Sequence, residues 1–410
     1  MSKTFTRIIK NILFGTNLLF IGIVSACLFG IPMQYTMVIL AIDSLLLIIA
    51  TRKILVDLPS LFLLAGMYIH SQVYEDPALH PCVTLIPFLL YCVGKGLILL
   101  ECDIKARIKA RLLILAMAIG LFINSLLNAM EYYLWGSDAT RRWIEFWSQW
   151  NIPATQHVFW QLLIVGLTFY FFCYIKKYKI SHSLLILGSV FSLWFSLTTG
   201  SRLLLMVFLV VLLINVLLFF YLNWNKDFIK KYLWVILSII IIATIAIAII
   251  WFTDLGGIRT YFQNSFWSRD GGILHNIRFQ AQIDAIRQLF KYPSGGRQMI
   301  LPSTLYFVHN VWLDMANASG IYSFSFIVIY TIFTFVDLFR LITNRRIDAE
   351  FKYLLMSAYF SFWLYYMVET ALDAHLMLWA VWMLVCGIIR GVVIKFNKKI
   401  KSKKTKKSAS

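Results

Sequence analysis

Stretches of about 20 predominantly apolar residues recur from one end of this 410-residue chain to the other. Each is long enough to cross a lipid bilayer as an α-helix, because a helix rises about 1.5 Å per residue and the hydrocarbon core is about 30 Å thick. Only 14% of the residues are charged, far fewer than a soluble domain of this length carries. The sequence therefore excludes a soluble helical protein and predicts an all-α, polytopic membrane protein.

The apolar runs predict twelve transmembrane helices separated by short polar segments. These spans lie near 11–33, 35–51, 54–71, 83–100, 112–130, 157–175, 182–199, 203–223, 233–252, 311–339, 353–370 and 375–394. The chain accordingly divides into nine helices within 1–252, a large external loop at 253–309, three helices within 310–395 and a basic tail at 396–410. The external loop is predicted to contain an amphipathic helix.

Basic residues are distributed unevenly between the two predicted sides of the membrane. Of the 38 lysines and arginines, 28 cluster on the side that holds both termini, Lys95 lies within a span, and nine lie on the other side. Short cytoplasmic loops carry such an excess of positive charge, so both termini are predicted to face the cytoplasm from a multi-pass position in the cytoplasmic membrane. The net charge of +19 is thereby explained without a nucleic-acid partner, and the lysine-rich tail is expected near anionic lipid headgroups.

Arginine dominates the predicted external side, where it accounts for eight of the nine basic residues. Five of these arginines stand in the stretch from Trp251 to Leu313, which contains the large loop. They are Arg259, Arg269, Arg278, Arg287 and Arg297. A guanidinium group binds phosphate through two parallel hydrogen bonds and stays charged when partly buried, so this composition favours an anionic substrate.

Arg202 follows a tight polar turn, from Thr198 to Ser201, between two predicted spans. An arginine at membrane depth is costly unless it is paired or faces water. Two interpretations stay open: the side chain extends to the headgroup layer, or it binds a lipid-linked phosphate.

Arg278 lies near the start of the predicted amphipathic helix, which rests on the membrane and ends before Pro293. Backbone N–H groups at a helix start favour an anion, which makes this arginine a candidate ligand contact. Arg287 stands three residues after Asp284, so a local ion pair is expected there instead.

Polar residues at the external ends of two later spans complete the set of candidates. His309 opens the span after the loop, where it is either a hydrogen-bonded interface residue or a general base that orients an acceptor. Asp314 is five residues further on, which places it on a different face of a regular helix. Glu369, with Asp373 and His375 close behind it, is a candidate to orient a sugar or to pair with the arginines.

The remaining polar residues give no sign of a metal site. Six cysteines are scattered through the chain without a CxxC pair, and the external side has no set of carboxylates or histidines at metal-ligand spacing. No metal or other cofactor is predicted. Within the spans, Asp43 and Lys95 are expected either to pair with each other or to line a cavity.

The order of these features resembles the O-antigen ligase and polymerase superfamily, which includes the Wzy-type polymerases. The shared features are a Ser-Arg turn between two spans, a large external loop late in the chain, an arginine-led amphipathic helix ending in Pro and Gly, and His-Asn at the start of the next span. The residues that carry the resemblance are Ser201, Arg202, Arg278, Ala285, Pro293, Gly295, Gly296, His309, Asn310, Leu313 and Gly320. By motif it covers roughly 195–375, and by number of spans the whole chain.

Two features depart from the family pattern. Members often carry a tryptophan four residues after the loop arginine, where this chain has Gln282. The Pro-x-x-Gly-x-Gly turn is shortened to Pro293-Ser294-Gly295-Gly296. These departures affect the alignment of the loop, so Arg259 or Arg269 are candidates to share the role of Arg278.

The resemblance implies a membrane glycosyltransferase of the GT-C type that needs no metal. Its donor is expected to be a glycan on undecaprenyl pyrophosphate, and its catalytic residues are expected to be His309, Arg278 and Arg202. The implied substrate-binding residues are Arg202, Arg259, Arg269, Arg278, Asn310 and Glu369. A flippase and a chain-length regulator of the same pathway are the implied protein partners.

The identity of the acceptor separates two activities within this family. A polymerase joins repeat units into O-antigen, capsular or exopolysaccharide, whereas a ligase transfers the glycan to another acceptor such as a lipid A core. The Ile- and Lys-rich, Ala-poor composition suits a Gram-positive organism without lipid A, which favours the polymerase.

A non-enzymatic alternative is a lipid-linked sugar flippase or another secondary transporter. Such proteins place charges near the middle of the membrane and contain repeats or broken helices. Here no internal repeat is visible and the external charge is concentrated in one loop, which favours an enzyme with a single outward-facing site.

Overall fold

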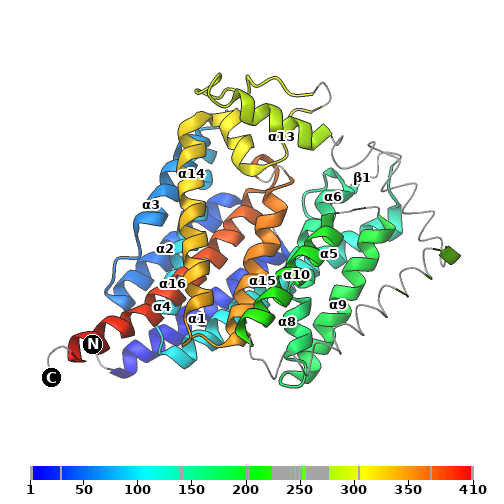
Figure 1. The fold of residues 1–410 in the computed structure, drawn as a ribbon. Helices are drawn as coiled ribbons and strands as arrows, with labels where there is room; N and C mark the ends of the chain where they lie inside the picture. Colours follow the sequence, from blue (N-terminus) through cyan, green and yellow to red (C-terminus); the bar gives the residue numbers. More distant parts are fainter. Residues whose placement is uncertain are drawn as a thin grey trace.

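The computed structural model describes residues 3–27, 30–138, 142–199, 201, 203–223, 245, 249, 252–254, 277–302, 305–369 and 372–407. Nearly all of this part of the chain is helical (Figure 1). The helices are α1 (Lys3–Ala26), α2 (Met33–Thr51), α3 (Leu58–Ser71), α4 (Leu79–Leu99), α5 (Asp103–Trp135), α6 (Ala154–His157), η1 (Val158–Gln161), α7 (Leu162–Gly166), α8 (Thr168–Cys173), α9 (Lys179–Thr198), α10 (Leu203–Leu222), α13 (Ile277–Gln288), α14 (Val311–Thr343), α15 (Ala349–Tyr366) and α16 (Leu372–Lys407). A short antiparallel hairpin, β1 (Arg142–Ile144) and β2 (Asn151–Pro153), pairs Trp143 with Ile152.

The prediction of an all-α, multi-pass membrane protein is confirmed. Among the described residues, eight helices are long and apolar enough to cross a membrane: α1, α2, α4, α5, α9, α10, α14 and α16. The α3 helix and the segment from η1 to α8 are apolar but shorter. The ninth predicted span, near 233–252, lies largely outside the described residues, so the number twelve stays a prediction.

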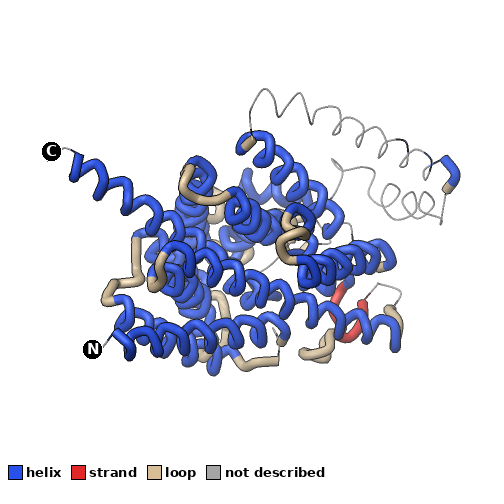
Figure 2. Tube along the Cα trace, turned by 90° about the horizontal axis from the view of Figure 1, so that it is seen from below, coloured by secondary structure: helices blue, strands red, loops and turns tan. Residues whose placement is uncertain are grey.

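Several predicted boundaries differ from the observed ones, and two of the differences lie near the ends of the chain. The first span was expected to continue to residue 33, but α1 ends at Ala26 and α2 begins at Met33. Pro32 precedes α2 as its N-cap residue, because a proline without an N–H group suits the start of a helix better than its interior. At the other end of the chain, α16 continues as one helix into the basic tail as far as Lys407, and Figure 2 shows its last turns projecting beyond the bundle.

Both termini lie at one end of the bundle, and α13 lies at the opposite end (Figure 1). The end that carries α13 is called the α13 end below, and the other is called the terminal end.

The tightest packing in the core joins α4 to α16, the two most deeply buried of the long helices. A Cβ atom on Gly387 would lie 2.1 Å from the carbonyl oxygen of Tyr91, and one on Gly94 would lie 2.5 Å from that of Leu384. Only glycine permits such contact between backbones, as small residues do in other membrane helix pairs. The α4–α16 pair therefore forms a rigid centre for the helices around it.

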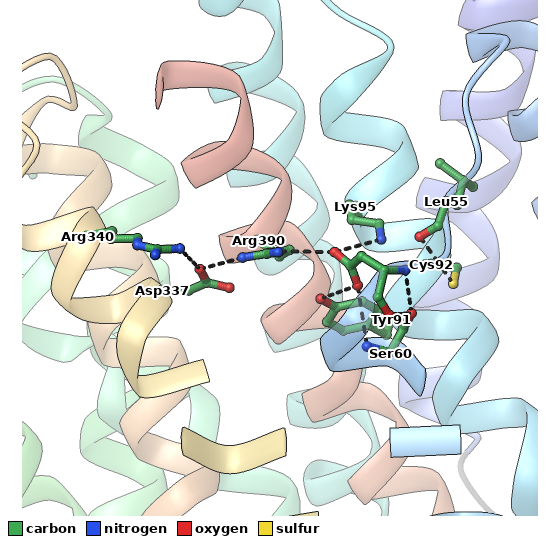
Figure 3. A network of polar contacts seen from close by, with 9 residues as sticks. Leu55, Ser60, Tyr91, Cys92, Lys95, Asp337, Arg340 and Arg390 are labelled. Carbon is green, nitrogen blue, oxygen red and sulfur yellow. Dashed lines mark hydrogen bonds and ion pairs between the residues drawn. The ribbon is translucent and has the colours of Figure 1, made fainter. Parts of the chain in front are cut away.

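A buried ionic network joins four elements toward the terminal end of this core (Figure 3). Asp57 caps α3, and its Oδ2 atom lies 3.1 Å from Lys95 Nζ on α4 and 3.0 Å from Arg390 Nε on α16. Arg390 also donates to Asp337 of α14 at 2.9 Å. Of the two interpretations left open for Asp43 and Lys95, the mutual ion pair is not the one observed, because the loop before α3 brings Asp57 to Lys95 instead.

Candidate active site

The short α13 helix presents one turn of polar side chains to the body of the protein. Ala281 and Ala285 are fully buried, and Ala285 belongs to a small apolar cluster with residues of the following loop and of α14. This packing fixes the rotation of the helix about its axis. Arg278 and Gln282 are four residues apart, so they project from the same face, toward the start of α14 and the end of α15.

A helix thus forms where the amphipathic helix was predicted, but its buried residues pack on protein, and its contact with the membrane stays a prediction. Phe279, Ile286 and Phe290 remain exposed on other faces of this segment. The local ion pair also forms as expected, with Arg287 Nη1 lying 3.7 Å from Asp284 Oδ1.

A break in α14 receives the turn that follows α13. The backbone of Gly320 has φ 87° and ψ −179°, which interrupts the helix and leaves backbone groups without helical partners. The Pro293–Met299 segment supplies new ones: Gly296 N donates to Ala318 O at 2.9 Å, and Ile321 N donates to Pro293 O at 2.9 Å. This docked turn holds α13 against α14.

The segment that carries His309 is shaped by the first turn of α14. Both oxygens of Asp314 accept backbone N–H groups on either side of the histidine, from Val308 at 2.7 Å and from Asn310 at 3.2 Å. The backbone of His309 adopts φ 59°, a left-handed conformation that is uncommon outside glycine. Asn310 caps α14 by accepting from Leu313 N at 3.2 Å. The imidazole is therefore held by a defined backbone.

Two amide side chains fasten this segment to α13 and to the end of α15. Gln282 Nε2 donates to His309 O at 3.0 Å and to Met367 O at 3.1 Å. Asn310 Nδ2 also donates to Met367 O, at 3.2 Å. Three elements that are distant in the sequence therefore meet at one point.

Glu369, three residues beyond α15, connects the arginine to the histidine. Its Oε1 atom accepts from Arg278 Nη1, and its Oε2 atom lies 3.3 Å from His309 Nδ1. The Glu369 side chain is 8% exposed, that of His309 15% and that of Arg278 37%. The carboxylate thus lies deepest, while the guanidinium is the most accessible of the three groups.

The electrostatics of the cluster keep Glu369 ionised. Burial on its own raises the pKa of this carboxyl, but the hydrogen bond from His309 and the charge of Arg278 outweigh burial and hold the pKa below its usual range. An ionised carboxylate only accepts hydrogen bonds, so the proton between the two residues belongs to His309 Nδ1. An imidazole with its single proton on Nδ1 has its lone pair on Nε2, the atom that can take a proton from a substrate.

The structure brings four of the predicted site residues together: Arg278, His309, Asn310 and Glu369. Arg202, Arg259 and Arg269 lie outside the described residues, as do the side chains of Asp373 and His375. The polar turn before Arg202 forms between α9 and α10, where the hydroxyl of Ser196 donates to Ser201 O at 2.6 Å.

Two members of the cluster were not predicted. Gln282 was interpreted as a departure from a family pattern, although its position one helical turn after Arg278 places both on one face. Asp314 was set aside because five residues separate it from His309. It contributes through backbone hydrogen bonds, and its place as an acidic residue in the first turn of α14 is the signal that could have revealed it.

The chemistry of the cluster combines an accessible cation with a buried acid–imidazole pair. Within the described ranges, no three His, Cys, Asp or Glu side chains gather in a way that could hold a metal ion. No model of a known protein family matches the chain, and no curated protein matches it.

Proposed function

We propose that this protein is a membrane glycosyltransferase that polymerises oligosaccharide repeat units carried on undecaprenyl pyrophosphate. The observation that carries the proposal is the convergence of Arg278, Glu369 and His309 at the α13 end of the bundle. A cation that binds a diphosphate leaving group must lie beside a base that receives the proton of the attacking hydroxyl, and this cluster holds both groups in one place.

The proposed reaction uses the residues of the cluster in separate roles. Arg278 binds the diphosphate of the donor and stabilises the negative charge that grows as the bond from the anomeric carbon to the diphosphate breaks. His309 Nε2 takes the proton of the acceptor hydroxyl while that oxygen forms the new glycosidic bond. Undecaprenyl pyrophosphate leaves, and the proton passes from the imidazole to solvent. Asn310 and Gln282 keep the imidazole in place through the backbone contacts described above.

The experiment is an elongation assay on the purified full-length protein with lipid-linked oligosaccharide in detergent. Arg278→Ala removes one charge-assisted contact, so elongation should fall about ten- to a hundredfold or more. His309→Ala should stop transfer while leaving donor binding nearly intact. Arg287→Ala is the matched control on the same helix and should elongate glycans normally, since Arg287 pairs only locally with Asp284 in the described contacts. Normal polymer from both site variants would refute the proposal.

Two alternatives remain testable in the same preparation. A ligase would transfer the glycan to an added lipid acceptor and would not lengthen it. A transporter of lipid-linked sugars is favoured by one observation: α14 is broken at Gly320, and transporters contain broken helices. A transporter would move the lipid-linked sugar across liposomes and would show no elongation in detergent, where no second compartment exists.

A further inference from the structure

The carboxylate of Glu369 occupies a position that is suited to bind an anionic group of a substrate. One of its oxygens is bound by Arg278 and the other lies within hydrogen-bond distance of His309. Both partners come from elements other than its own, α13 and the start of α14. In this arrangement Arg278, the residue proposed to bind the anion, is paired with a carboxylate of the protein itself.

We propose that Glu369 is a positioning residue that the donor displaces from Arg278, after which its carboxylate acts on His309 alone. The inference rests on the proposed function, because it assigns the anion to the diphosphate of the donor. It adds an exchange of partners: Arg278 is bound to Glu369 before the donor arrives and to the donor afterwards.

The exposure of the three side chains gives this exchange a direction. The Arg278 side chain is 37% exposed and Glu369 only 8%, so an anion arriving from outside meets the guanidinium first. The contact with Glu369 engages a single carboxylate oxygen. A diphosphate carries more charge and presents several oxygens, which suits the bidentate geometry of a guanidinium better.

The exchange also changes the environment of the imidazole. Glu369 contacts the imidazole directly, whereas Arg278 from α13 and Tyr365 from α15 interact with Glu369. Asp314 is engaged with the backbone on both sides of the histidine, and Tyr365 is fully buried and neutral. Once the donor neutralises Arg278, the charge of Glu369 is no longer shared, so it stabilises an imidazolium more strongly. The carboxylate of Glu369 therefore acts on His309 alone only when donor is bound.

The test measures two quantities on Glu369→Gln, which removes the charge and keeps the shape of the side chain. Inorganic pyrophosphate is titrated calorimetrically into the purified full-length protein. If Arg278 is paired with Glu369 about nine-tenths of the time, releasing it should tighten binding about tenfold. Elongation at saturating donor should fall about a hundredfold, because the base loses its partner. The substitution should therefore improve binding and impair turnover together.

The control variant is Asp284→Asn, which makes the same chemical change beside Arg287 on the same helix. It should alter neither pyrophosphate affinity nor elongation. If Glu369→Gln does not fold, Glu369→Ala tests the same point, since it also releases Arg278. Weaker pyrophosphate binding in the Glu369 variants, or a loss of both properties in proportion, would overturn the inference. Tighter binding in a protein whose parent elongates no glycan would support the exchange and refute the glycosyltransferase.

Discussion

The break in α14 at Gly320 should control the geometry of the site from a distance. Replacing this glycine by alanine introduces a Cβ atom 2.5 Å from the carbonyl oxygen of Pro293 and 2.8 Å from the carbonyl carbon of Ser294. The backbone at this position, with φ 87° and ψ −179°, also belongs to a region that only glycine populates readily. The turn after α13 must therefore move away, or α14 must straighten.

The loss of stability in Gly320→Ala is the sum of backbone strain and weakened hydrogen bonds. Backbone strain at such a position costs roughly 1–3 kcal/mol. The docked turn also places two hydrogen bonds at risk, Gly296 N to Ala318 O and Ile321 N to Pro293 O, each worth about 1 kcal/mol. We expect Gly320→Ala to lower the free energy of unfolding by about 3–5 kcal/mol. Because a displacement of about 1 Å can cost about a hundredfold in rate, elongation should fall more than stability alone would require.

Equilibrium unfolding in mixed micelles and the elongation assay measure the two effects. Gly295→Ala approaches the same contact from the other side, with its Cβ 2.4 Å from Gly320 N, and should behave alike. Gly15→Ala on α1 is the control, because its added Cβ meets nothing within 4 Å and a helical alanine is favoured over glycine by about 1 kcal/mol. Unchanged stability and elongation in Gly320→Ala would refute the argument.

Three further predictions concern charge and orientation. Asp57→Asn leaves buried Lys95 without this carboxylate and should cost about 3 kcal/mol, whereas adding Lys95→Met should restore about 2 kcal/mol; additive losses in equilibrium unfolding would contradict this coupling. The pKa of Glu369 is lower in the folded protein than the value of about 4.3 expected in the unfolded chain, so this group stabilises the fold above that pH. The stabilisation disappears as the pH falls through the folded-state pKa. The difference in unfolding free energy between the parent and Glu369→Gln should therefore close on acidification. A cysteine at Phe290, which is 80% exposed, introduced into a variant without other cysteines, should react with an impermeant reagent on intact cells; reaction only after permeabilisation would reverse the proposed orientation.

The sequence predicts the helical architecture well because its signal is local. A long apolar run forms a helix in a bilayer wherever it stands, since no other arrangement satisfies its backbone. The same local reasoning places α13 from the spacing of its apolar residues, and it anticipates the pair of Arg287 with Asp284. It misplaces the boundary near Pro32, because the first predicted span continues to residue 33 whereas α1 ends at Ala26.

The composition of the site follows only in part from the sequence, because its contacts join distant segments. Arg278 and Glu369 are 91 residues apart, and they meet through the packing of α13 against α14 and the position of the segment after α15. No spacing rule contains that information. Asp314 illustrates a second limit. Helical periodicity places it on a different face from His309, but the left-handed backbone of His309 turns the preceding chain so that Val308 N donates to the carboxylate of Asp314.

The Asp57 network and the Glu369 cluster are suited to different tasks. In the network at the terminal end, Asp57 caps α3 and also contacts two cations, Lys95 and Arg390. The Lys95 side chain is 2% exposed and that of Arg390 is 18% exposed. An incoming ion would have to break several buried contacts at once, which is costly for a paired charge in the core. In the cluster at the α13 end the order is reversed, because the 37% exposed guanidinium of Arg278 stands in front of its acid. Of the two arrangements, only the second allows an incoming anion to replace the internal carboxylate at one face of the bundle. A transporter would need such an exchange along a path through the bundle.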